Sequence, residues 1–180
     1  MINILMAAIL ISNLQKQPAK ECVQMEYIAQ VDQFCKDYHL AYDDLDHPNS
    51  ILTIEGDRAF ISDEEIELME RVVMSEARGE SCEGQEGVAT VILNRWQDGS
   101  FGETISDVCY ASGQFAAPWG GEISMSVHLA VKNAIIYYNT YCQDLPTQIL
   151  YFRSDHYHTF GTPYISIGNL YFSARDGVLL

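Results

Sequence analysis

Basic residues are scarce in this sequence. Ten lysines and arginines stand against 25 aspartates and glutamates, which gives a formal net charge of -15 at pH 7. Fifteen of the acids but only three of the bases lie between Asp37 and Glu86, so the negative charge is concentrated in one part of the chain. A field of this sign repels the phosphates of nucleic acids and of anionic lipids. We therefore predict no nucleic-acid partner, and interpret the acidity as a source of solubility or as a surface for a basic protein.

Cysteine spacing excludes two further classes of protein. The five cysteines are odd in number and form no C-x-x-C pair, which is the pattern of neither a disulfide framework nor a zinc site. A single bridge in an oxidising compartment stays open. His156 and His158 would share one face of a strand next to Asp155, but a third ligand at suitable spacing is missing. We predict no metal and no cofactor, and interpret the histidines as substrate-edge or loop residues.

No apolar run is long enough to span a membrane. The longest, "ILMAAILI" at residues 4–11, is well short of the roughly 20 residues that a spanning helix needs. No basic residue precedes it, and the first lysines follow it, which is unlike a secretory signal. We predict a packing segment or a partner-binding helix and no stable membrane span. A cleaved signal and an atypical membrane-engaging signal are the alternatives.

The chain divides near residue 50. Residues 20–38 carry apolar side chains at three- and four-residue intervals, the pattern of an amphipathic helix. The stretch "YDDLDHPNS" at residues 42–50 is typical of a linker, and its acids lack the glycine and the closing glutamate of a calcium loop. We predict an N-terminal helical extension and linker at residues 1–50 and a main domain at residues 51–180.

The main domain combines helical and strand patterns. "SDEE" at residues 62–65 is a capping box, which predicts a helix from Asp63 to about Ala77. Apolar residues at helical spacing predict further helices from about Ser81 to Arg95 and over residues 125–139, with a short turn of helix at 104–110. Two β-rich runs, residues 148–152 and 164–174, predict an antiparallel pair. The predicted fold class is therefore α+β.

One acidic residue falls on an apolar helix face. Glu76 follows Met69, Val72 and Val73 at helical spacing, which predicts that its carboxylate faces inward. A carboxyl group in an apolar environment keeps its proton to higher pH and can act as a general acid. The alternative is a structural ion pair with a neighbouring arginine. The candidate partners are Arg71, Arg78 and Arg95.

The segment "VVMSEARGESCEGQEGVATVILNR" at residues 72–95 resembles the signature of the SleB-type cell wall hydrolases, a family of spore-cortex-lytic enzymes that also occurs in phage genomes. That signature is a helix ending in E-A-R-G-E, then E-G-Q, then an apolar helix closing in I-L-N-R. "TISDVCYASGQF" (104–115), "LYFRSDHYH" (150–158) and "IGNLYFSA" (167–174) are similar to later blocks of the family. The resemblance covers about residues 66–174.

The resemblance implies a lysozyme-like catalytic domain at residues 51–180 that cuts peptidoglycan between N-acetylmuramic acid and N-acetylglucosamine. It also implies lytic transglycosylase chemistry, in which one glutamate protonates the glycosidic oxygen and then deprotonates the muramic 6-hydroxyl. Carried over to this sequence, that glutamate is Glu76. A route with water as nucleophile usually needs a second carboxylate across the sugar. The candidates for it, all in polar stretches, are Glu80, Glu83, Asp98 and Glu103.

The resemblance also supplies a binding site for the glycan. The predicted substrate-binding residues are Gln114, Phe115, Trp119, Tyr151 and Asn169. Gln114 and Phe115 match the Q-F pair of the family, whereas Asn169 is interpreted equally well as a turn residue. Asn94 and Arg95 are interpreted as structural. The loop before "YISIGN" is short and lacks a tryptophan often found in the family, which predicts a different cleft depth and number of subsites.

A second interpretation keeps the fold without the chemistry. The chain would then be a virion or envelope structural protein that binds glycan or a partner, with weak or no catalysis. A metal hydrolase that uses the terminal histidines is a third. The predicted partners are peptidoglycan glycan strands and, through residues 1–50, a virion or envelope protein. We expect the site of action to be the bacterial cell wall or periplasm, with delivery in a phage particle as one route.

Overall fold

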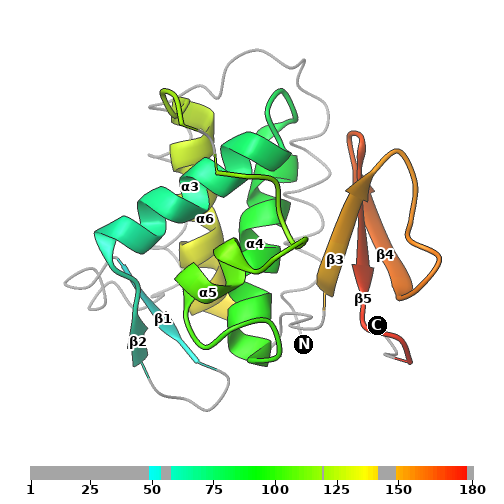
Figure 1. Ribbon diagram of the computed structural model, residues 1–180, viewed down its shortest axis with the longest axis horizontal. Coiled ribbons are helices and arrows are strands. Elements are labelled where there is room, and N and C mark those ends of the chain that lie inside the picture. Colours follow the sequence, from blue (N-terminus) through cyan, green and yellow to red (C-terminus); the bar gives the residue numbers. More distant parts are fainter. Residues whose placement is uncertain (1–48, 54–57, 119, 142–148, 178–180) are drawn as a thin grey trace.

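The computed structural model describes residues 49–53, 58–118, 120–141 and 149–177. Helices occupy the centre, with a three-stranded sheet on one side and a two-stranded hairpin on the other (Figure 1). The helices are α3 (Asp63–Glu76), α4 (Cys82–Asp98), α5 (Ile105–Tyr110) and α6 (Met125–Tyr141). The strands are β1 (Ser50–Leu52), β2 (Arg58–Phe60), β3 (Ile149–Ser154), β4 (Thr162–Ile167) and β5 (Leu170–Ala174). The predicted α+β class is confirmed, whereas the predicted helical extension at residues 1–50 lies almost wholly outside the described residues.

Local signals start and stop the helices close to their predicted positions. Ser62 Oγ accepts the N–H of Glu65 at 3.2 Å, and the Glu65 carboxylate accepts the N–H of Ser62 at 3.2 Å, which are the reciprocal bonds of a capping box. Ser81 caps α4 by accepting the N–H of Gly84 at 3.3 Å. Gly99 ends α4 in the left-handed conformation, with φ 73°. The capping box is confirmed, and α4 extends slightly beyond its predicted end.

The hydrophobic core lies among the helices, with α4 at its centre. α4 contacts α3, α5, α6 and β3. Residues with no exposed surface on α3, α4 and α6 include Met69, Val72, Val73, Val88, Val91, Ile92 and Val131. Each such aliphatic side chain contributes about 1.5–3 kcal/mol on burial. The core therefore fixes α3 and α4 relative to each other, and the end of α3 carries Glu76. Among the described residues, no helix is long and apolar enough to cross a membrane.

The larger sheet is antiparallel, with strand order β3-β5-β4. The second predicted β-rich run divides into two strands at Gly168 and Asn169. Gly168 has φ +57°, which suits the first central position of a two-residue hairpin turn. A turn this short barely interrupts an apolar pattern, although Gly-Asn is itself a turn signal. The antiparallel β1–β2 hairpin was not predicted, because strands of three residues are too short to show alternation.

α4 docks onto the sheet through a glycine and two polar side chains. A Cβ atom on Gly87 would lie 2.6 Å from Cζ of Phe172, so this ring packs directly against the helix backbone. Asn94 Nδ2 donates to the carbonyl of the first residue of β3 at 3.0 Å. Arg95 Nε donates to the carbonyl of the second at 2.8 Å. These bonds support the structural interpretation of Asn94 and Arg95.

Candidate active site

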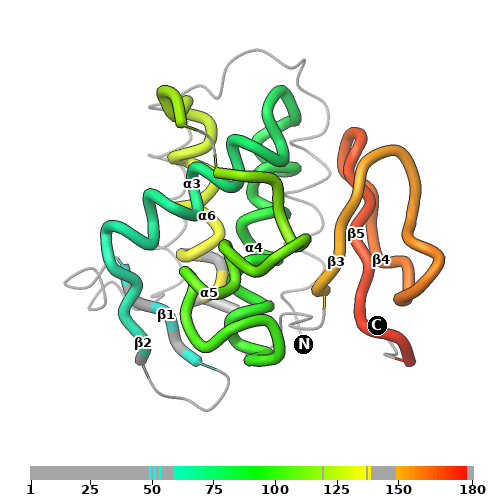
Figure 2. Tube along the Cα trace, viewed as in Figure 1, coloured from blue at the N-terminus to red at the C-terminus, as the bar shows by residue number. Residues whose placement is uncertain are grey.

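Glu76 is the last residue of α3 and lies against the segment that follows α5. This segment, residues 111–118, runs toward the C-terminal end of α3 (Figure 2). The backbone N–H of Ala116 donates to Oε1 of Glu76. Next to it, Ser75 Oγ lies 2.9 Å from the carbonyl oxygen of Ala117 and donates to it. The carboxylate of Glu76 is therefore partly buried and held by a backbone donor.

Glu76 forms no ion pair with any of the residues that the structure describes. Arg71, one of its predicted partners, pairs with Glu67 on the preceding turn of α3. The prediction that Glu76 faces inward is met only in part, because the buried acid of α3 is Glu70, at 8% exposure. Glu70 lies in the middle of the helix and bonds His128 of α6. Glu76 lies at the helix end, where a loop rather than a helix covers it.

Arg95 is a buried cation in the same region. It is 5% exposed, and its guanidinium carbon lies 4.7 Å from the ring centroid of Phe115 and 4.9 Å from that of Phe101. Burial lowers the pKa of Arg95 to about 10, although Tyr151 and Glu76 favour the charged form. The guanidinium is thus charged at neutral pH, and its Nη1 atom has no hydrogen-bond partner among the described residues. The result is a fixed positive charge between two rings, within electrostatic reach of Glu76.

Two of the predicted substrate-binding residues flank this cation. Phe115 stacks on the Arg95 guanidinium, and Tyr151 of β3 lies near enough to affect its pKa. Gln114 precedes Phe115 and is exposed. The structure therefore brings Phe115 and Tyr151 together around Arg95 and leaves Gln114 on the loop surface. Trp119 lies outside the described residues.

Asn169 occupies the turn between β4 and β5. Its backbone N–H donates to Oε2 of Glu80 at 3.3 Å, and its carbonyl accepts the N–H of Asp155 at 3.0 Å. A Cβ on the neighbouring Gly168 would lie 2.7 Å from Glu80 Oε2, so the carboxylate fits closely against the turn. These backbone bonds match the interpretation of Asn169 as a turn residue, while its side chain is exposed.

The candidates for a second catalytic carboxylate have other environments. Glu80 bonds the β4–β5 turn, and Asp98 pairs with Arg175 at 2.7 Å. Glu83 and Glu103 are exposed. None of the four makes a hydrogen bond or an ion pair with Glu76 in the part of the chain that the structure describes.

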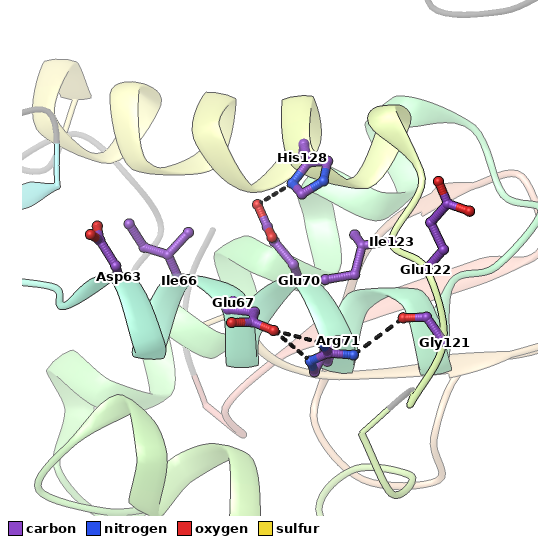
Figure 3. A pocket seen from close by; sticks show the side chains of 9 residues that line it. All are labelled: Asp63, Ile66, Glu67, Glu70, Arg71, Gly121, Glu122, Ile123 and His128. Atoms are coloured by element: carbon purple, nitrogen blue, oxygen red, sulfur yellow. Dashed lines mark hydrogen bonds and ion pairs between the residues drawn. The ribbon is translucent and has the colours of Figure 1, made fainter.

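A hollow of about 600 Å³ lies along α3, and Glu76 is not among its lining residues (Figure 3). Its lining residues are Asp63, Ile66, Glu67, Glu70, Arg71, Gly121, Glu122, Ile123 and His128. Figure 3 shows two polar links across it. Glu70 Oε1 lies 2.7 Å from Nδ1 of His128, and Arg71 joins Glu67 to the carbonyl of Gly121. These links tie α3 to α6 and to the loop before it, which is a structural role.

The histidines near the C-terminal end of the chain lie in the loop after β3. Asp155 has a positive φ of 73°, and His156 is exposed. His158 Nε2 donates to the carbonyl of Phe152 at 3.1 Å. Within the described ranges, no group of three or more His, Cys, Asp or Glu side chains is placed to hold a metal ion.

The sequence prediction missed the backbone donor at Ala116 and the contribution of Phe101. Ala116 acts through its N–H, and the residue type of a backbone donor carries no signal of that role. Phe101 follows α4 in the chain and contacts Arg95 only because the chain folds back there. The one available signal was the glycine- and proline-containing loop after α5, since such loops often carry functional groups.

Comparison with known protein families gives a match over much of this region. The family model described as Cell Wall Hydrolase matches residues 79–173. Glu76 lies just before the matched range, so its role does not follow from this match.

Individual relatives cover a shorter stretch. The spore cortex-lytic enzymes of Oceanobacillus iheyensis and Bacillus cereus are each 39% identical to the chain over 75 residues, or 42% of the chain. The matched stretch spans 27% and 29% of these two relatives. The crystal structure of the catalytic domain of the Bacillus cereus SleB protein is similar, with a TM-score of 0.53 and 29% identity. That likeness covers 62% of this chain and 91% of the solved domain.

Proposed function

The chain belongs to the cell wall hydrolase family, and from that premise we propose that it cleaves the glycan strands of peptidoglycan. The bond cut is the one between N-acetylmuramic acid and N-acetylglucosamine, and the site of action is the bacterial cell wall. The family match and the likeness to spore cortex-lytic enzymes support this proposal. Glu76 is its catalytic residue.

In the proposed reaction Glu76 acts first as an acid and then as a base. Its carboxyl group donates a proton to the glycosidic oxygen as the bond from that oxygen to C1 of the muramic sugar breaks. The resulting carboxylate takes the proton of the 6-hydroxyl group. At the same time the oxygen of that hydroxyl group bonds to C1 of the muramic sugar. The product is a 1,6-anhydro end, Glu76 regains its proton, and no water is consumed.

The hydrogen bond from Ala116 to Glu76 is the observation that carries this assignment. The N–H engages Oε1, and Oε2 makes no hydrogen bond with the described residues, so one oxygen is fixed and the other is available to the sugar.

The surroundings favour a single-glutamate route. Hydrolysis uses two carboxyl groups across the sugar, about 6.5–9.5 Å apart where water attacks directly and about 5–5.5 Å apart where the second carboxylate attacks. Two of the candidates for this second group are already engaged, Asp98 with Arg175 and Glu80 with the β4–β5 turn. We assign sugar binding to Phe115 and Tyr151 beside Arg95. Gln114 on the loop surface, Asn169 at the turn and Trp119, which lies outside the described residues, complete the proposed set.

Purified peptidoglycan sacculi, followed by mass analysis of the released muropeptides, test the proposal. We expect 1,6-anhydro ends from the parent chain. Glu76→Gln keeps the shape but removes the acid, and should lower the rate about 10²- to 10⁴-fold, the usual contribution of a general acid. Glu64→Gln is the matched control, because Glu64 is exposed on the first turn of the same helix. Its activity should equal that of the parent.

Each other outcome points to a different correction. Release of reducing ends would replace the single-glutamate route by hydrolysis, while cleavage itself would stand. Full activity of Glu76→Gln would remove Glu76 from the mechanism. Binding to sacculi without any release would favour the virion or envelope binding protein. A protein partner for residues 1–50 stays a separate prediction.

A further inference from the structure

Three aromatic side chains cluster beside β3. The loop of residues 155–161 carries His158 and Phe160, whose ring centroids lie 4.6 Å apart with an interplanar angle of 25°. Phe160 also meets Tyr151 of β3 edge to face, at 5.2 Å and 87°. His158 and Tyr151 are 6.4 Å apart at 75°. Each ring therefore contacts the other two, and the three act as one unit.

The loop holds these rings in place without a ligand. At its start, the N–H of Asp155 donates to the carbonyl of Asn169 at 3.0 Å. At its end, the N–H of Gly161 donates to the Asp176 carboxylate at 2.7 Å. Between them, His158 Nε2 donates to a backbone carbonyl of β3 at 3.1 Å. A ligand that binds these rings would find them already ordered, which lowers the entropic cost of binding.

Phe160 remains open to solvent despite the two rings packed against it. It is 49% exposed, whereas phenylalanine is among the residues most often buried. Tyr164 on the neighbouring strand β4 is similarly exposed, at 45%. Tyr164 has no ring contact with the cluster. Phe160 therefore combines exposure with contacts to two other rings of the cluster, and Tyr164 offers exposure alone.

Tyr151 connects the cluster to the proposed catalytic site. Its ring lies 6.5 Å from that of Phe101, which in turn stacks on the Arg95 guanidinium at 4.9 Å. The charges of Arg95 and Glu76 interact. A row of ring contacts thus leads from Phe160 to Arg95, and the loop lies within the range matched by the family model.

We propose that Phe160 and His158 form a sugar-stacking subsite for one N-acetylated pyranose ring of the glycan strand, separate from the sugars at the cut bond. The inference rests on the proposed function for the identity of the glycan. One face of a pyranose ring presents C–H groups, and such a face packs against the negative face of an aromatic ring. A nucleic-acid base would stack equally well, but the charge of -15 opposes its phosphates.

The test measures glycan binding in the Glu76→Gln background, so that no cleavage confuses the result. The probes are purified sacculi, in a co-sedimentation assay, and the tetramer of N-acetylglucosamine, in a titration by calorimetry. We expect Phe160→Ala to weaken binding of both probes about tenfold, as for loss of one stacking ring. Phe160→Trp should restore it, because the aromatic face returns. Phe160→Leu should not, because it restores only apolar area.

Tyr164→Ala is the matched control, since it removes a ring of similar exposure outside the cluster. In the Glu76→Gln background it should bind both probes as tightly as the Glu76→Gln chain alone. Thermal unfolding should show that all variants are folded. The subsite is overturned if Phe160→Ala binds like Tyr164→Ala, if Phe160→Leu restores binding, or if the Glu76→Gln chain binds neither probe. A parent chain that binds through Phe160 but does not cut sacculi would refute the proposed cleavage and keep the subsite. A parent chain that cuts sacculi while Phe160→Ala binds normally would refute the subsite alone.

Discussion

The guanidinium carbon of Arg95 lies 4.7 Å from the centroid of the Phe115 ring, and the residue after Phe115 donates its N–H to Glu76. One ring therefore links a buried charge to the loop that holds the proposed catalytic carboxylate. The negative charge of Glu76 also favours the charged form of Arg95. We expect Arg95 to position Glu76 through this loop without touching the substrate.

Arg95→Met should therefore lower the rate of cleavage. It removes the guanidinium on which Phe115 stacks, so the loop that carries the Ala116 N–H is less firmly held against Glu76. Loss of the Nε bond to β3 and of two cation–π contacts should also cost about 1–3 kcal/mol of unfolding free energy. Arg95→Lys keeps the charge but not the planar stacking, so its rate should also fall. The measurement is the rate of sacculus cleavage by each folded variant.

Asn94→Ala is the control for the structural part of this effect. Asn94 makes the neighbouring bond to β3, and its loss should lower stability without lowering the cleavage rate of the folded protein. If Arg95→Met and Asn94→Ala cleave sacculi at the same rate, Arg95 is only a structural tie between α4 and β3.

Gly87 should resist replacement even by alanine. In a helix interior, alanine has a more favourable intrinsic helix propensity than glycine by about 1 kcal/mol. The Cβ of an alanine at this position would, however, lie 2.6 Å from Cζ of the buried Phe172. Overpacking of this kind costs about 1–3 kcal/mol, so Gly87→Ala should be destabilised by up to about 2 kcal/mol in urea unfolding. Gly120→Ala is the matched control, because a Cβ there meets no atom within 4 Å. A Gly87→Ala chain as stable as the parent would mean that Phe172 has room to move.

Features that depend on local chemistry were predictable from the sequence. The capping box at Ser62 and Glu65 needs only residues three apart, and it forms as predicted. The apolar faces of α3 and α4 follow from their spacing, since a helix repeats every few residues whatever it packs against. The family resemblance is likewise confirmed, because it rests on contiguous motifs.

Features that depend on contacts between distant segments were not predictable. The spacing of Glu76 placed it on the apolar face but could not show that a loop covers the end of α3, so Glu70 was overlooked as the buried acid. Glu80 lies in a polar stretch of the sequence, which gave no sign that its carboxylate accepts a hydrogen bond from a turn 89 positions away. Phe101, Phe115 and Tyr151 meet around Arg95 only in the folded chain.

Cys109 should be unreactive while the protein is folded. Burial raises the pKa of the Cys109 thiol to about 12, with Glu65 adding to this effect and Arg95 opposing it. At pH 8 roughly one molecule in ten thousand would then carry the reactive thiolate. Iodoacetamide labelling at pH 8, followed by peptide mass analysis, should leave Cys109 unmodified in buffer and modify it in guanidinium. Cys82, which is only partly buried, is the internal comparison and should label first. Rapid labelling of native Cys109 would show that α5 opens easily.

Glu86 should make the stability of the fold depend on pH. Burial raises the pKa of Glu86 from 4.5 to about 7, with Glu83 raising it further and a hydrogen bond from Asn133 lowering it. Because the folded pKa exceeds the unfolded value, the folded state binds the proton more tightly. The contribution of Glu86 to stability is therefore complete below about pH 4.5 and is lost as the pH rises through about 7.

Glu86→Gln removes the ionisation and isolates this effect from that of the other acids. At pH 8 the variant should be more stable than the parent by about 1–3 kcal/mol, because the parent then carries a charge that the fold partly removes from water. At pH 4 the unfolding free energies of the parent and of Glu86→Gln should agree within about 0.5 kcal/mol, since the parent is then neutral at this position. Urea unfolding at pH 4, 6 and 8 measures the difference. Glu103→Gln removes the same charge from an exposed loop and should show no such trend. A stability difference between parent and Glu86→Gln that stays constant with pH would mean that Glu86 ionises as freely in the folded chain as in the unfolded one.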